Sequence, residues 1–296
     1  MGLIEAHAAL AGRFAVVVGG ASGHIGRAVT LGLARAGVAV ACCDNDVDGL
    51  AAIVPEVEAL GGRVVAVEAD VLDAHALDRF YEAVEAAFPH VDILVNVAGG
   101  VERRLFMETT RDQHARDVRL NYGYIIDSVQ HAVPLIRRGG RGGSIINFTT
   151  IEAHRGAATY AVYAGAKAAT TNFSRAMAVE LGGEQIRVNL IAPDTSPARA
   201  SNAALYPEDF ARLAELGPDA LEQGIAMYVP QKRSPSVDDL VNGILFLASD
   251  LARSITGTTL HIDGGTIAAL GFLDWPEDSF MPAPLGGSLR RLAPQA

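Results

Sequence analysis

The sequence predicts an α/β protein built on a doubly wound parallel sheet of about seven strands, with helices on both faces. Short apolar segments alternate with longer segments in which apolar residues recur at helical spacing. The short segments are apolar throughout, which is typical of parallel strands buried on both faces. Because crossovers between parallel strands are right-handed, this alternation leaves few possible arrangements of the strands.

The predicted elements follow one another in a regular order and are bounded by glycine-rich or polar turns. The predicted strands are 14–18, 38–43, 63–69, 91–97, 143–148, 186–192 and 258–262. The predicted helices are 25–36, 47–60, 74–88, 110–138, 158–182 and 237–249. Sheets of this kind bind ligands beyond the carboxyl ends of their strands, so the residues that follow each strand are the candidates for a site.

The chain of 296 residues contains no low-complexity linker or internal repeat before about residue 270. Half of its residues are apolar and 20% are charged, as in globular proteins. Residues 1–270 are therefore predicted to form one domain, in which 194–235 is a substrate-loop segment. Residues 271–296 form an extension that we expect to be partly disordered or to pack at a subunit interface.

Charge and cysteine content exclude several classes of partner. With 24 basic and 34 acidic residues, the net charge of −10 opposes binding to nucleic acid or to an anionic membrane. Cys42 and Cys43 are adjacent in a predicted strand, which points them to opposite faces, so neither a disulfide nor a metal site is expected. The chain has no apolar run of membrane-spanning length and no targeting signal at its start, so we expect a cytoplasmic protein.

A glycine-rich turn joins the first strand to the first helix and reads Gly19-Gly20-Ala21-Ser22-Gly23-His24-Ile25-Gly26. Its glycines let backbone N–H groups and the helix N-terminus approach a pyrophosphate. Asp44 ends the second strand, eighteen positions after Gly26. Its carboxylate would accept hydrogen bonds from the adenosine ribose and would repel a 2′-phosphate, which favours NAD over NADP.

Two acidic positions keep an alternative interpretation. Asp44, Asn45 and Asp46 together would also suit a solvated turn. Asp70 closes the third strand and is a candidate for contact with the adenine edge, but a single Asp at this place is more often a helix N-cap.

Tyr163 and Lys167 are four residues apart in a predicted helix and therefore share one of its faces. An ammonium group beside a phenol stabilises the phenolate and lowers the pKa of the phenol toward the working range of a general acid or base. Tyr160, one turn earlier, has Ala164 at the matching position and lacks such a cation.

Taken together, these motifs resemble those of the short-chain dehydrogenase/reductase family, from about Leu10 to Gly265. The residues that carry the resemblance, in addition to the glycine turn, are Asp44, Asp70-Val71, Asn96-Val97-Ala98-Gly99, Asn121, Thr149-Thr150, Tyr163 with Lys167, Arg187 to Pro193, and Ile262 to Gly265. The resemblance implies a Rossmann-like fold and hydride transfer between a nicotinamide and a carbonyl or secondary alcohol.

The resemblance also implies roles for individual residues. Tyr163 would exchange a proton with the substrate oxygen, Lys167 would hold the nicotinamide ribose and lower the pKa of Tyr163, and Thr150 would hydrogen-bond the substrate oxygen where the family usually has Ser. Asn121 would keep a water molecule in the proton relay. The implied cofactor contacts, besides Tyr163 and Lys167, are Gly20, Ser22, Gly23, His24, Ile25, Gly26, Asp44, Asn45, Asp70, Val71, Asn96, Ala98, Gly99 and Pro193.

The sequence departs from the family pattern at several of these places. His24 stands where one branch of the family has Gly, and it puts a side chain beside the expected pyrophosphate. Gly165 replaces a frequent Ser, and Asp194 replaces the Gly that usually follows Pro193. Thr150 keeps the hydroxyl of the usual Ser, but its χ1 is stiffer.

The substrate side should be formed by three segments at carboxyl ends of strands, namely 100–106, 151–157 and 194–235. The last segment is too long for an ordinary connection and is predicted to close over bound substrate as a lid. Polar side chains that could orient a substrate, each also compatible with a solvated loop, are Glu102, Arg103, Arg104, His154 and Arg155.

Three functions fit these features. The first is an NAD(H)-dependent oxidoreductase that acts on a small secondary alcohol or ketone, which the resemblance implies is a homodimer or homotetramer. The second is an NAD-dependent epimerase or dehydratase, and the third is a non-catalytic nucleotide-binding protein on the same fold. An idle protein would not need Tyr163, Lys167, Asn121 and the hydroxyl at Thr150 together, which argues against the third.

Overall fold

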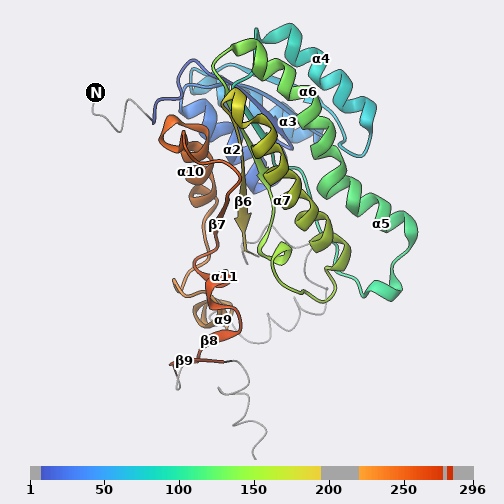
Figure 1. Cartoon of the computed structure of the whole chain (residues 1–296), viewed down its shortest axis with the longest axis vertical. Coiled ribbons are helices and arrows are strands. Elements are labelled where there is room, and N and C mark those ends of the chain that lie inside the picture. Colours follow the sequence, from blue (N-terminus) through green and yellow to red (C-terminus); the bar gives the residue numbers. More distant parts are fainter. Residues whose placement is uncertain (1–7, 195–219, 276–278, 283–296) are drawn as a thin grey trace, which may run out of the picture.

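The computed structural model describes residues 8–194, 220–275 and 279–282, and these contain the predicted seven-stranded parallel sheet. The strand order is β3-β2-β1-β4-β5-β6-β7, so the chain runs outward from β1 to β3, crosses back beside β1 and continues to β7 (Figure 1). The direction of winding therefore reverses between β1 and β4, where α/β sheets bind their ligands. The strands are β1 (Phe14–Val18), β2 (Ala39–Asp44), β3 (Val64–Glu68), β4 (Ile93–Asn96), β5 (Gly143–Phe148), β6 (Ile186–Pro193) and β7 (Thr259–Ile262).

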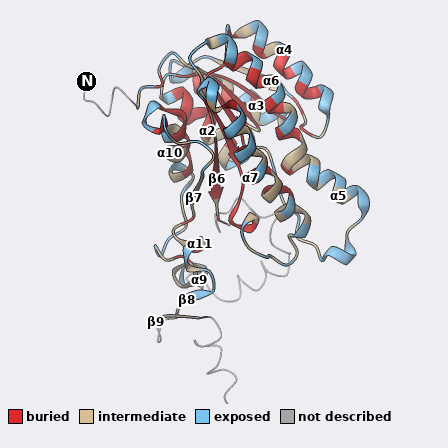
Figure 2. Cartoon of the chain, in the orientation of Figure 1, coloured by how far each residue is buried: buried red, intermediate tan, exposed pale blue. Residues whose placement is uncertain are grey.

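Helices cover both faces of the sheet, and successive residues of each central strand supply the two cores. In β1, Val16 and Val18 pack under one set of helices, while Ala15 and Val17 pack under the other. The sheet and the inner faces of the helices form the buried interior (Figure 2). The first face is covered by α4 (Ala74–Ala87), α6 (Tyr124–Gly139) and α7 (Ala161–Leu181), and the second by α2 (His24–Arg35), α3 (Val47–Ala59) and α10 (Val237–Ala248).

The single helix predicted over 110–138 is wrong in one respect, because the structure divides it. It consists of α5 (Arg111–Val118), one π-helical turn, η2 (Arg119–Gly123), and then α6. A π turn shifts the hydrogen-bond register and is often found at functional sites. This turn contains Asn121, one of the predicted catalytic residues. The short 3₁₀ turns of the described chain are η1 (Phe106–Glu108), η3 (Ile151–Ala153), η4 (Gly182–Glu184) and η6 (Asp250–Ala252).

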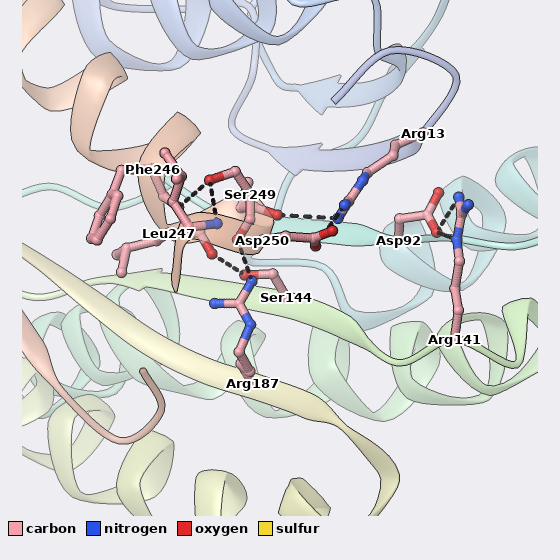
Figure 3. Close-up of polar contacts among 11 residues, drawn as sticks. Arg13, Asp92, Arg141, Ser144, Arg187, Phe246, Leu247, Ser249 and Asp250 are labelled. Carbon is pink, nitrogen blue, oxygen red and sulfur yellow. Dashed lines mark hydrogen bonds and ion pairs between the residues drawn. The ribbon is translucent and has the colours of Figure 1, made fainter. Parts of the chain in front are cut away.

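At the amino ends of the strands, polar contacts fix the C-terminal end of α10 to the sheet (Figure 3). The Ser144 hydroxyl of β5 donates to the Leu247 carbonyl over 2.9 Å, and the Arg187 guanidinium of β6 donates to the Ser249 carbonyl over 3.2 Å. Arg13, just before β1, pairs with Asp250 at 2.7 Å. These contacts lie at the amino ends of the strands, whereas the predicted site lies at the carboxyl ends. We therefore expect them to stabilise the fold and to take no part in the site.

Beyond the carboxyl ends of β6 and β7 lies a small group of elements, seen at the lower end of Figure 1. It comprises α9 (Ala220–Tyr228), α11 (Thr266–Ala269) and the antiparallel hairpin of β8 (Phe272–Trp275) and β9 (Ser279–Pro282), and α9 packs against β8. The rest of the predicted lid, 195–219, and residues 276–278 and 283–296 of the predicted extension lie outside the described residues.

Within the described ranges, no helix combines the length and the apolar character needed to span a membrane.

Candidate active site

The turn after β1 is packed so closely that its key positions have no room for a side chain. A Cβ atom on Gly26 would lie 1.9 Å from the Gly19 carbonyl oxygen, and one on Gly19 would lie 2.7 Å from the Cα of Ala98. Helix α2 then begins at His24, and no side chain caps its first N–H groups. Uncapped N–H groups at a helix N-terminus are suited to an anion such as a pyrophosphate. The turn therefore has the shape and the donors that a dinucleotide requires.

Asp44 is buried and braces this turn. Its Oδ2 atom accepts hydrogen bonds from the backbone N–H groups of Ala21 (3.0 Å) and Ser22 (2.8 Å), and its Oδ1 atom accepts one from Asp46 (3.2 Å). Only 4% of Asp44 is exposed, so the interpretation of this residue as part of a solvated turn is wrong. Asn45, the next residue, is exposed. Each carboxylate oxygen has two acceptor positions, so Oδ1 keeps capacity for a ribose hydroxyl.

Asp70 and Val71 follow β3 at the same edge of the sheet. The carboxylate of Asp70 accepts the Leu72 N–H group at 2.9 Å, and Asp70 itself is half-buried. The N-cap of α4 is Asp73 rather than Asp70, so the N-cap alternative does not describe Asp70. Val71 is buried, and its carbonyl accepts a hydrogen bond from Arg119.

The residues at the carboxyl end of β4 divide into a structural part and a part that faces the glycine turn. The Asn96 side chain is fully buried, donates to Asn147 at 2.8 Å and accepts from Ser128 at 2.7 Å, so it joins strands and helices under the site. Ala98 contacts the glycine turn through its backbone, which donates to the Val18 carbonyl. Two other predicted cofactor contacts are Ile25, in the first turn of α2 and half-buried against the core, and Pro193, the last residue of β6.

Gly99 lies where two predicted catalytic side chains meet. A Cβ atom at Gly99 would lie 3.0 Å from Oδ1 of Asn121 and 3.1 Å from Nζ of Lys167. Asn121 clamps the adjacent backbone, because its amide donates to the Gly100 carbonyl (2.9 Å) and accepts from the Gly100 N–H group (3.1 Å). Its own carbonyl accepts the Thr170 hydroxyl of α7 at 2.9 Å. The π turn thus joins the end of β4 to the helix that carries Tyr163 and Lys167.

Lys167 is a buried cation beneath Tyr163. Its ammonium group donates to the Phe148 carbonyl at 3.0 Å and lies 6.0 Å from the centre of the Tyr163 ring. Burial lowers the pKa of Lys167 from 10.5 to about 8. The amine therefore remains largely protonated at neutral pH, but it does so at a cost in free energy.

The pKa of Tyr163 moves in the direction opposite to the one expected. Burial raises this pKa well above its ordinary value, and the Glu152 carboxylate raises it further, while the Tyr163 hydroxyl is hydrogen-bonded with Thr150. The predicted lowering by Lys167 is therefore opposed by a neighbouring carboxylate. Position 152 carries this effect, although the sequence reasoning did not single it out.

Glu152 lies in η3, two residues after Thr150 and at the carboxyl end of β5. It is only 6% exposed, its Oε2 atom accepts the Thr150 hydroxyl, and its Oε1 atom accepts Arg155 at 2.7 Å. The available signal was its position, since it follows a candidate catalytic hydroxyl within a segment predicted to border the substrate. Glutamate is mostly exposed in proteins, so the residue type alone does not predict burial at position 152.

Arg155 joins this carboxylate to the lid. Its guanidinium lies 4.0 Å from the buried carboxylate of Asp194 and hydrogen-bonds the Tyr228 hydroxyl at the end of α9. Burial, followed by Asp194, raises the pKa of Tyr228 to about 12. Two residues that the sequence singled out, Arg155 and Asp194, are thus partners in one buried cluster, while His154 is exposed and stacks edge-on with His261.

The loop after β4 forms the other wall of the site. Arg103 of this loop donates a hydrogen bond to the hydroxyl of Thr159, just before α7, at 3.2 Å. Thr159 has a φ of +68°, which is an uncommon conformation for a β-branched residue. The Arg103 guanidinium lies 5.7 Å from the Tyr160 ring centre. A hollow in front of Tyr163 is lined by Glu102, Arg104, Phe106, Asp117 and Tyr160, among others.

Comparison of the sequence with known proteins identifies the family of this chain. A family model described as enoyl-(acyl carrier protein) reductase matches residues 19–266. The chain belongs to the short-chain dehydrogenase/reductase family. The L-rhamnose 1-dehydrogenase (NAD(P)(+)) of Azotobacter vinelandii is 33% identical over 259 residues, which cover 86% of this chain and 97% of that protein.

Solved structures agree with this assignment to the short-chain dehydrogenase/reductase family. A 7α-hydroxysteroid dehydrogenase complexed with NADH and 7-oxo glycochenodeoxycholic acid is 29% identical, with a TM-score of 0.80 and coverage of 90% of this chain and 98% of that one. A gluconate 5-dehydrogenase from Burkholderia cenocepacia, in complex with NADP and tartrate, is 25% identical, with a TM-score of 0.78 and coverage of 89% and 98%. The chain is an enzyme of this family, whose named members are NAD(P)-dependent dehydrogenases and reductases.

Proposed function

We propose that this enzyme transfers a hydride between NAD(H) and a secondary alcohol or ketone, and that Tyr163 exchanges the accompanying proton with the substrate oxygen. One observation carries the proposal: Tyr163, Thr150, Lys167 and Asn121 meet beyond β4 and β5, beside a turn whose glycines 19, 20 and 26 have no room for a side chain. When bound, the nicotinamide would accept or supply the hydride.

The cofactor would be held by the glycine turn and by the first N–H groups of α2 at its pyrophosphate, and by Asp44 at its adenosine ribose. NAD is favoured over NADP because the buried Asp44 carboxylate would meet a 2′-phosphate with like charge. Titration of the protein with the two dinucleotides measures this preference. Equal or tighter binding of NADP would contradict it.

Each catalytic side chain has a separate task. Tyr163 gives a proton to a carbonyl oxygen or takes one from a hydroxyl group, and Thr150 holds that oxygen. Lys167 supplies positive charge below the phenol, and Asn121 fixes the backbone at Gly99 and Gly100 while keeping the water of the proton relay. The substrate enters between the loop after β4 and the segment that contains α9.

The Tyr163→Phe variant tests the catalytic assignment. Without the phenol hydroxyl we expect turnover to fall by about 100-fold or more, because general acid–base catalysis contributes that much. Binding of the dinucleotide should change little, and fluorescence of the reduced nicotinamide measures it. Turnover comparable to that of the unmodified enzyme would remove Tyr163 from its role.

Stoichiometric formation of reduced cofactor separates an oxidoreductase from an epimerase or dehydratase.

We also propose a homodimer or homotetramer. Each of the three helices α5, α6 and α7 carries one of the large apolar side chains that are exposed in the single chain, and Val179 of α7 is 85% exposed. Val118 and Ile126 are 42% and 37% exposed. Light scattering on the purified protein determines the number of subunits, and a monomer would contradict the proposal.

A further inference from the structure

Glu152 is a buried carboxylate without a part in the proposed chemistry described above. It is 6% exposed, and both of its oxygens are engaged, one by Thr150 and the other by Arg155. Asp194, also buried, lies near the same guanidinium. Burying a carboxylate costs several kcal/mol unless its partners compensate, and here two carboxylates face one arginine. Such an arrangement is a weak source of stability, but it places a negative charge next to the Thr150 hydroxyl group.

The hydrogen bonds of Thr150 can be counted. A threonine hydroxyl has one hydrogen to donate and two lone pairs that accept. Its hydrogen is directed to Oε2 of Glu152, and one lone pair receives the Glu152 N–H group at 3.4 Å. One lone pair remains. The hydrogen bond between Thr150 and Tyr163 must then be donated by the phenol, whereas a threonine can lower the pKa of a phenol only by donating to it.

We propose, on the basis of the function proposed above, that Glu152 is a positioning residue that acts through Thr150: it takes the threonine hydrogen, so that Thr150 accepts from Tyr163 and the phenol is held in its protonated form. The negative charge of Glu152 acts in the same direction. The cation that opposes it is Lys167, whose Nζ atom lies 6.0 Å from the centre of the Tyr163 ring.

The consequence for the reaction depends on its direction. Reduction of a carbonyl needs Tyr163 as a proton donor, and Glu152 preserves that form at higher pH. Oxidation of an alcohol needs the phenolate, so Glu152 moves the rise of the oxidation rate to higher pH. Among the described residues, the charged and titratable groups around Tyr163 and Glu152 are Lys167, Tyr160, Arg103, Arg155, Asp194 and Tyr228, together with Glu102, Arg104 and Asp117 in the hollow in front of Tyr163.

Two substitutions separate the charge of Glu152 from its hydrogen bond. Glu152→Gln removes the charge but keeps an oxygen that can accept from Thr150, and Glu152→Met removes both while keeping a similar length. In the pH profile of kcat/KM for alcohol oxidation, we expect the apparent pKa to fall by at least about one unit in the Gln variant and by more in the Met variant. Asp194→Asn is the matched control, since it removes a buried charge beside Arg155 without touching Thr150. It should shift the profile less than either Glu152 variant.

A second measurement does not depend on turnover. The phenolate of Tyr163 absorbs in the ultraviolet, and subtracting the titration of a Tyr163→Phe protein isolates its signal in the unmodified enzyme and in the Glu152 variants. The titration of Tyr163 should shift in the same direction and order as the kinetic profile. The proposal is wrong if both readouts are unchanged in the Glu152 variants, if Asp194→Asn shifts them equally, or if Gln and Met both abolish folding, which would make Glu152 a structural residue.

These results are distinguishable from failure of the proposed function. Absence of NAD-dependent turnover in the unmodified enzyme would reject the oxidoreductase, yet the absorbance titration would still report whether Glu152 controls Tyr163.

Discussion

Replacing Lys167 with Met should make the protein more stable near neutral pH while removing its activity. The ammonium group of Lys167 is 3% exposed and has one described hydrogen-bond acceptor, the Phe148 carbonyl at 3.0 Å. Burial lowers its pKa from 10.5 to about 8. Each unit is worth ~1.4 kcal/mol, so keeping the amine charged in the folded state costs about 3 kcal/mol at neutral pH. A Met side chain has nearly the same length and avoids this cost.

The variant also loses the hydrogen bond to Phe148, which contributes about 1 kcal/mol. The net gain for Lys167→Met is therefore about 2 kcal/mol near neutral pH, or roughly 3 °C in Tm. The gain must depend on pH in a defined way. Below about 8, Lys167 is protonated in both states and the cost is complete. As pH rises from about 8 to 10.5, the folded protein has released its proton while the unfolded chain keeps it, so the unmodified protein gains stability relative to the variant.

Calorimetric melting of both proteins across this pH range provides the measurement. Because the difference between the two proteins is compared, ionisation of other groups cancels. Lys232→Met, at the exposed second lysine of the chain, is the control and should show no comparable change with pH. A Lys167→Met protein that is less stable at neutral pH, or whose stability difference is constant with pH, would refute the reasoning. The variant should also lose dinucleotide binding, which explains why a costly lysine is kept.

Two further predictions concern the walls of the site. Thr159→Gly relieves the strained φ of +68° and should raise the free energy of unfolding by about 1 kcal/mol. Thr159→Val keeps the strain and loses the hydrogen bond from Arg103, so it should lower the free energy of unfolding. Urea unfolding that ranks the two variants in the reverse order would contradict this prediction. Asp274→Asn weakens the ion pair with Lys232 that holds β8 near α9. The KM for substrate should therefore rise up to about fivefold while kcat is unchanged. An unchanged KM would show that the hairpin of β8 and β9 does not support the lid.

The sequence was sufficient for the fold because several independent patterns agree on it. The apolar strands, the glycine turn and the carboxylate of Asp44 each require the same sheet, and the observed order places them together. The glycine positions were predictable for a physical reason, since at Gly26 any side chain would overlap the Gly19 carbonyl. Tyr163 and Lys167 were predicted because a helix brings residues four apart onto one face and because the other motifs stand in the matching order around this pair.

What the sequence could not supply depends on contacts between distant segments. No sequence motif in residues 119–123 predicts the π turn at Asn121. In the structure, the Thr170 hydroxyl of α7 donates a hydrogen bond to the Asn121 backbone carbonyl, which is a contact between distant segments. The direction of the Tyr163 pKa shift was also hidden. A tyrosine beside a lysine suggested lowering, but burial and Glu152 act the other way, and neither can be read from a spacing of four residues.

The site is therefore best understood as a phenol between two ionisable groups that oppose each other. Lys167 favours the phenolate and Glu152 favours the phenol, and both side chains are buried. If this balance sets the chemistry, the two single variants should shift the pKa of Tyr163 in opposite directions. The pKa should fall in Glu152→Gln and rise in Lys167→Met. The double variant should return the titration toward that of the unmodified protein, because the two opposing charges then leave together. Shifts of the same sign in both single variants would show that burial, and not the pair of charges, controls the tyrosine.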